Sequence, residues 1–186
     1  MQKKEKTMIR ERANKTRDLV LGAFFLALGI VLPFLTGQIP EIGSRLLPMH
    51  IPVLLCGYIC GWEYGLFVGL VMPLLRSVMF GMPPLFPTAA AMAFEMAAYG
   101  AITGILYQKL PKNTISVYIT LIVAMLVGRL VWGAVSIVLN GIAGSTFSRQ
   151  IFLAGAFLDA VPGIILQIAV IPVIILALQK WLRYQK

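Results

Sequence analysis

The chain has 186 residues, of which 59% are hydrophobic and only 12% are charged, and its formal net charge is +9. The charged share is about half of that in a typical soluble domain, so a water-soluble globular protein is excluded. The basic residues are not interleaved with aromatic residues over a folded surface, which argues against a nucleic-acid-binding protein.

The first 17 residues form a basic arm in front of the first apolar segment. The arm holds seven of the sixteen Lys and Arg residues: Lys3, Lys4, Lys6, Arg10, Arg12, Lys15 and Arg17. Such a block is typical of a cytoplasmic flank that contacts anionic lipid headgroups. No small-residue cleavage site followed by a polar mature region comes after the apolar segment, so we expect the first helix to be retained.

Six apolar segments follow, and each predicts a membrane-spanning helix. They cover residues 18–35, 46–60, 64–80, 86–107, 115–139 and 151–178. The second is shorter than the roughly 20 residues that cross a bilayer, so five spans, with the termini on opposite sides, are the alternative. Six spans with the N-terminus inside put twelve basic residues on the inner side and only two, Arg45 and Arg149, in outer loops. This bias favours six spans with both termini cytoplasmic.

We therefore predict an all-α integral membrane protein, a bundle of six transmembrane helices in one domain. Residues 1–17 are the cytoplasmic arm, residues 18–180 the membrane domain and residues 181–186 a cytoplasmic tail. Small residues recur every four positions: Gly57, Gly61, Gly65 and Gly69, and later Ala89, Ala93, Ala97 and Ala101. This spacing predicts helices whose backbones approach closely. Cys56 and Cys60 share one helix face and are expected to be packing residues.

Ionisable residues within the predicted spans are candidate functional residues, because a charge inside a membrane is costly. They are His50, Arg76, Glu95, Arg129 and Asp159, with Asn140 and Gln167 as polar companions. On the six-span topology all five charges fall in the outer half, which predicts a polar pocket that is open to the exterior. The alternative is two buried ion pairs, each of an arginine and a carboxylate, that pin helices together. His50, the only histidine, lies between Pro48 and Pro52 and fits a packing role better than a metal site.

The motifs of ATP-binding and catalytic proteins are absent from the sequence. It contains no G-x-x-x-x-G-K-[ST], no H-E-x-x-H and no nucleophile elbow. We therefore expect no catalysis and no metal ion, and any ATP used in transport would be bound by another subunit.

Several stretches resemble the substrate-binding S components of energy-coupling factor (ECF) vitamin transporters. They are residues 17–28, with Ala23 and Ala27 four apart, residues 47–57, then Gly61 and residues 65–69, and residues 73–77. The resemblance runs over nearly all of residues 17–180. It implies a multi-pass protein of the bacterial plasma membrane that binds a vitamin at the outer side, beneath loops one, three and five.

The resemblance also implies partners and a cycle. The face of Ala23 and Ala27 would dock on a membrane T component that carries two ATPase subunits, and these subunits would bind the ATP. Toppling of the S component, driven by ATP, would then move the ligand inward. From the residues alone, intramolecular packing is the alternative role of the alanine pair.

Within that family the sequence is most similar to the pantothenate type, in which Arg76 or Arg129 would bind a carboxylate. Pyridoxine and hydroxymethylpyrimidine transporters are the alternatives, in which Glu95 and Asp159 would bond a neutral heterocycle. Aromatic residues such as Trp132, Tyr99 and Phe86 would suit a ring. The predicted substrate-binding residues are His50, Arg76, Glu95, Arg129, Trp132, Asn140 and Asp159.

Two other classes of protein stay open. An intramembrane enzyme acting on lipid or prenyl substrates would use Glu95, Asp159 or His50 as acid and base. A secondary carrier would work alone, without ATPase subunits.

Overall fold

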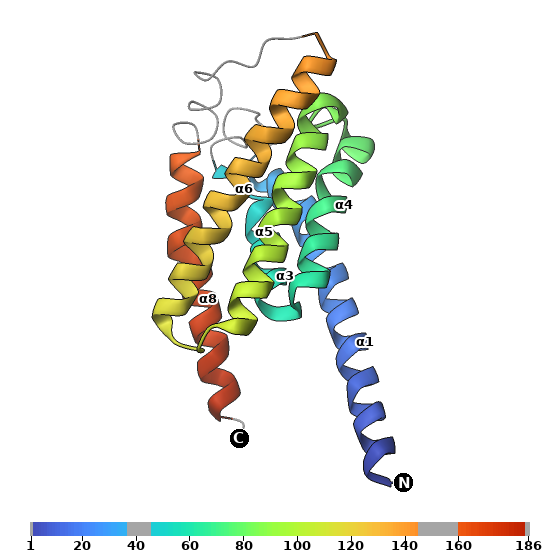
Figure 1. The fold of residues 1–186 in the computed structure, drawn as a ribbon, viewed down its shortest axis with the longest axis vertical. Coiled ribbons are helices and arrows are strands. Elements are labelled where there is room, and N and C mark those ends of the chain that lie inside the picture. Colours follow the sequence, from blue (N-terminus) through green and yellow to red (C-terminus); the bar gives the residue numbers. More distant parts are fainter. Residues whose placement is uncertain (1, 37–45, 145–159, 185–186) are drawn as a thin grey trace.

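The computed structural model describes residues 2–36, 46–144 and 160–184, and every regular element in these ranges is helical. Figure 1 shows the helices packed as one bundle. The elements are α1 (Gln2–Val31), η1 (Leu32–Thr36), α3 (His50–Cys60), α4 (Trp62–Phe80), η2 (Leu85–Ala89), α5 (Ala90–Lys109), α6 (Thr114–Ile142) and α8 (Val161–Tyr184).

Five of the described stretches are long and apolar enough to cross a membrane. They are Lys15–Phe34, Trp62–Phe80, Leu85–Lys109, Thr114–Ile142 and Val161–Lys180. The prediction of an all-α, multi-pass membrane protein is thereby confirmed. The start of α1 and the end of α8 lie at the same end of the bundle (Figure 1), and six passes stay a prediction. That this end faces the cytoplasm stays a prediction.

The short second segment is helix α3, whose 11 residues reach only about 16 Å at 1.5 Å per residue. Eight of them are buried, from His50 to Tyr58. Helices α1, α4, α5 and α8 all pack against α3. A helix too short to cross the hydrocarbon is therefore shielded from lipid by its neighbours.

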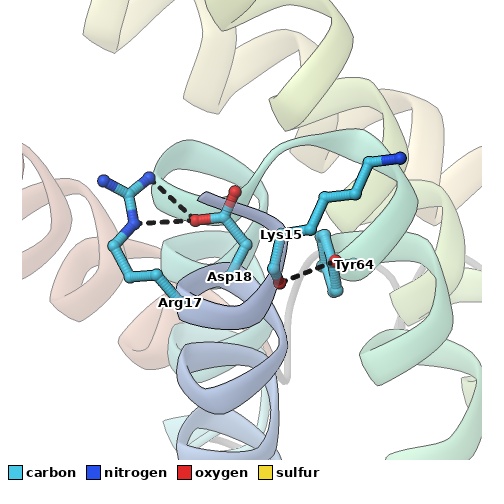
Figure 2. A network of polar contacts seen from close by, with 4 residues as sticks. All are labelled: Lys15, Arg17, Asp18 and Tyr64. Atoms are coloured by element: carbon cyan, nitrogen blue, oxygen red, sulfur yellow. Dashed lines mark hydrogen bonds and ion pairs between the residues drawn. The ribbon is translucent and has the colours of Figure 1, made fainter. Parts of the chain in front are cut away.

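Helix α1 starts at Gln2, so the basic arm continues the first membrane helix without a break. Figure 1 shows this end of α1 projecting beyond the other helices. Where α1 meets α4, the Tyr64 hydroxyl donates to the Lys15 carbonyl at 3.3 Å, and Arg17 pairs with Asp18 at 2.8 Å (Figure 2). The exposed ion pair contributes little to stability, whereas the Tyr64 bond joins two helices. The boundary predicted at residue 17 stays a prediction.

Helices α3, α4 and α5 pack backbone to backbone. Gly61 alone connects α3 to α4 and has a positive φ of 95°, which favours glycine. A Cβ built on Gly57 or Gly65 would lie 2.5 or 2.7 Å from the Gly100 carbonyl oxygen. The predicted glycine spacing therefore does place helices in close contact. It did not single out Gly100, the residue on α5 that they meet.

Candidate functional site

Three of the predicted site residues form a buried charge cluster, defined here as His50, Glu95 and Arg129. Arg129 Nη1 lies 2.9 Å from Glu95 Oε1, and His50 Nε2 lies 3.7 Å from the same oxygen. The exposed fractions of the side chains are 1% for His50, 2% for Glu95 and 7% for Arg129. The alternative to a polar pocket was a set of two buried ion pairs, each of an arginine and a carboxylate. One such pair, Arg129 with Glu95, is present.

The antiparallel course of α5 and α6 explains why Glu95 and Arg129 meet. Glu95 precedes Lys109, the last residue of α5, by 14 residues, and Arg129 follows Thr114, the first residue of α6, by 15. At 1.5 Å per residue both therefore lie about 21–23 Å from the turn that joins the helices. His50 begins α3 and reaches the same carboxylate from a third helix.

Tyr99 extends the cluster by one turn along α5. Its ring meets that of His50 edge to face, with centroids 5.2 Å apart. Its ring also packs on Gly128, where a Cβ would lie 2.5 Å from a ring carbon. Gly128 therefore makes room for Tyr99 directly beside Arg129, and sequence reasoning had assigned that glycine no role.

Several buried polar atoms of the cluster have no hydrogen-bond partner in the part of the chain that the structure describes. They are both ring nitrogens of His50, Oε1 of Glu95, and Nε and Nη2 of Arg129. Glu95 Oε1 thus lies within ion-pair distance of Arg129 Nη1 without a hydrogen bond to it. Folded proteins pair the large majority of such atoms, and leaving one unpaired costs about 1–3 kcal/mol. The unpaired atoms therefore mark a position at which a polar ligand or water would bind. Thr103, Thr120 and Gln167 carry further unpaired atoms.

A cavity of about 220 Å³ lies beside the cluster, between α5, α6 and α8. The lining residues are Tyr99, Ile122, Met125, Leu126, Arg129, Ile164 and Ile168. Arg129 lines the cavity, but the surface of the cavity is apolar, so the unpaired nitrogens of Arg129 are not exposed in it. Most of the other lining residues are aliphatic, and in helices that are apolar throughout they carry no sequence signal that would have identified them.

Arg76 makes a different set of contacts from Arg129. Its Nη1 donates to the Ile30 carbonyl at 2.6 Å, and its guanidinium lies 5.3 Å from the Phe34 ring centroid and 5.4 Å from that of Phe80. Ile30 is in the last turn of α1, where carbonyls lack helical partners and a cation is favoured. The contacts of Arg76 therefore attach α4 to α1, and its assignment to the ligand stays a prediction.

The remaining predicted site residues are spread along α6 or fall outside the described part. Trp132 and Asn140 are half-buried, and Asn140 Nδ2 donates to the Ser136 carbonyl at 2.8 Å. Asp159 lies outside the described residues, so neither the second ion pair nor its role at a ligand is tested. Phe86, proposed as an aromatic wall, is 48% exposed.

The alanine pair of α1 is on the outer surface of the bundle. Ala23 and Ala27 are both exposed, and so are Val20, Phe24 and Val31 of the same helix. Intramolecular packing, the alternative role of this pair, therefore does not account for it among the described residues. An exposed apolar helix face that carries small residues suits contact with lipid or with a helix of another protein.

Comparison with known proteins identifies the family of the chain. The family model described as "ECF transporter, substrate-specific component" matches residues 17–175. No curated protein and no solved structure matches the chain. The matched range includes the charge cluster, the cavity and the exposed alanine pair.

Proposed function

The chain belongs to the family of ECF transporter substrate-specific components, and from that premise we propose that it captures a vitamin carboxylate outside the cell, with pantothenate as the favoured ligand. Members of this family work with a membrane T component and ATPases, and they are transporter subunits rather than enzymes. In our proposal two ATPase subunits supply the ATP hydrolysis, this chain binds no nucleotide, and the membrane is the bacterial plasma membrane.

One observation carries the proposal for the ligand: Arg129 is buried and its Nε and Nη2 atoms are unpaired. A guanidinium bonds a carboxylate through two parallel N–H groups, and such a contact is strong when it is shielded from water. Pyridoxine or hydroxymethylpyrimidine, the alternative ligands, would instead bond Glu95 and Asp159 through neutral donors. Because Glu95 already pairs with Arg129, one of these two carboxylates is partly occupied.

The exposed alanine pair supports a docking role for α1. Ala23 and Ala27 offer a flat strip on which a helix of the T component could pack closely. A binding site formed by α3, α5, α6 and α8 would then be separate from the docking helix. Docking and ligand binding should therefore respond to different substitutions.

The test measures binding and transport separately. Purified protein without partners should bind pantothenate in isothermal titration without ATP, and native mass spectrometry should find the retained compound chemically unchanged. A modified compound would indicate an enzyme. Uptake into liposomes should require the T component and ATPases, whereas uptake by this chain alone would indicate a secondary carrier.

The docking assignment has its own variant. Ala27→Trp should abolish uptake in the full complex and leave ligand affinity within about twofold of wild type. Ile165→Trp, at a 62% exposed position of α8, is the matched control and should retain both activities. If Ala27→Trp lowers affinity as much as uptake, α1 is not a separate docking surface.

A further inference from the structure

Gln167 belongs to a buried stripe along α8. Gln167, Ile171 and Ile175 follow each other at intervals of four residues and therefore share one face of the helix. Their exposed fractions are 1%, 0% and 2%, whereas Ile165, on the outer side of α8, is 62% exposed. Ile171 and Ile175 are part of the hydrophobic core of the bundle. The stripe therefore faces the interior, and Gln167 puts an amide where an aliphatic side chain would continue it.

This amide lies at the depth of the charge cluster. Ile164 and Ile168, which flank Gln167 on α8, line the same cavity as Arg129. The described residues of the cavity wall do not include Gln167, and its stripe faces α3 and α6, the helices on which α8 packs. His50 and Arg129 come from these two helices. Gln167 is therefore directed into the polar interior of the bundle, away from the apolar cavity.

Both polar atoms of the Gln167 side chain, Oε1 and Nε2, are without a hydrogen-bond partner in the described part of the chain. Burial of an unpaired amide lowers stability, and an apolar side chain at this position would avoid that cost. The neighbouring polar groups differ in what they can bond. The unpaired Nε and Nη2 of Arg129 can only donate, and Glu95 Oε1 is held in an ion pair with Arg129. Gln167 Oε1 is therefore an acceptor available to an N–H group of a ligand.

We propose that Gln167 is a ligand-binding residue, whose Oε1 accepts a hydrogen bond from an amide N–H of the ligand. The inference rests on the proposed function and adds to it the requirement that the vitamin carries an amide as well as a carboxylate. Pantothenate meets this requirement, because an amide joins its two halves. An amide N–H that leaves water needs an acceptor, so an acceptor within an apolar bundle gives selectivity for ligands that have such a group.

The ester analogue of pantothenate, in which oxygen replaces the amide nitrogen, tests this hydrogen bond. It keeps the carboxylate and the shape of the ligand and lacks the N–H donor. In isothermal titration of the purified full chain, the ester should bind more weakly than pantothenate by about tenfold or more, because Gln167 Oε1 would stay buried without a donor. Gln167→Met, whose side chain has a similar length and neither donates nor accepts strongly, should bind pantothenate about tenfold more weakly than wild type. This variant should distinguish the two ligands by less than about threefold.

Stability without ligand separates a binding role from a packing role. Gln167→Met removes a buried unpaired amide, so it should resist unfolding in mixed micelles at least as well as wild type. Ile165→Met, at the 62% exposed position two residues away, is the matched control and should leave both affinities unchanged. A loss of affinity without a loss of stability is expected of a ligand-binding residue and not of a structural one.

Each opposite result overturns the inference. Equal binding of pantothenate and its ester by wild type would show that the amide N–H does not bond the protein, and this comparison depends on no variant. If Gln167→Met keeps wild-type affinity, or still separates the two ligands as wild type does, the N–H bonds another group. In each of these cases the proposed function stands. If wild type binds neither ligand, the proposed function fails as well.

Discussion

The ion pair of Glu95 and Arg129 predicts strongly non-additive effects on stability. Arg129→Met would leave a carboxylate whose side chain is 2% exposed and which has His50 Nε2 3.7 Å from its Oε1 atom. Removing one partner of a buried pair costs about 3–5 kcal/mol, because the remaining charge is unpaired. Glu95→Met, which leaves the guanidinium of Arg129 without its carboxylate, should lower stability by a similar amount.

The double variant Glu95→Met/Arg129→Met should be close to wild type in stability. Replacing a whole buried pair by apolar residues of similar volume is often neutral or stabilising, by about 1–4 kcal/mol. With the lower figure of about 3 kcal/mol for each single variant and a double variant equal to wild type, the magnitude of the coupling free energy is about 6 kcal/mol. That is well above the few tenths of a kcal/mol expected for distant, independent sites.

The assay is reversible unfolding in mixed micelles, followed by circular dichroism as the fraction of denaturing detergent rises. Leu130→Met, at a 64% exposed position next to Arg129, is the control and should change stability little. Additive single effects would contradict the buried pair. The double variant should also have lost carboxylate binding while remaining folded, and wild-type affinity in this variant would show that Arg129 does not hold the ligand.

Two further predictions concern the framework around the cluster. Gly100→Ala should destabilise the bundle by about 1–3 kcal/mol, because its Cβ would overlap the Gly65 carbonyl, whereas Gly141→Ala, which meets open space, should be nearly neutral in the same unfolding assay. Arg76→Met should speed hydrogen exchange at the end of α1, since the Ile30 carbonyl loses its donor, and should leave ligand affinity within about twofold. An affinity loss of tenfold or more would instead support the sequence-based assignment of Arg76 to the ligand.

The sequence predicted the class of fold because few kinds of backbone structure are stable in lipid. A chain that is 59% hydrophobic must satisfy its backbone within helices, and the length of each apolar run then indicates where they lie. The short second segment was identified correctly, and α3 is indeed short and enclosed. The basic arm in front of the first apolar segment continues the same helix, and the boundary between arm and membrane domain stays a prediction.

The candidate site was predictable only where a charge marked it. Glu95 and Arg129 stand out in apolar helices, and their antiparallel spacing from one turn brings them together. The hydrogen-bond acceptor of Arg76 could not be predicted. It is the main-chain carbonyl of Ile30, and every residue type has such a carbonyl. The cavity wall was equally hidden, because Ile164 lines it while the neighbouring Ile165 is exposed, and the two residues have the same side chain.

The arrangement of contacts distinguishes a closely packed core of helices from a docking helix that keeps one face exposed. Helices α3, α4 and α5 touch through glycine backbones, and packing of this kind leaves no room for sliding. Helix α1, by contrast, exposes one apolar face, packs its other side on α3 and α4, and has a polar attachment to α4 near each end, from Tyr64 and from Arg76. A partner that binds the exposed face of α1 would therefore move the body as a unit through this packing and the two polar attachments, and the buried charge cluster would keep its geometry during the movement. Loss of both attachments, in Tyr64→Phe/Arg76→Met, should consequently reduce transport more than ligand binding, and an equal loss of both would show that body and docking helix are not mechanically distinct.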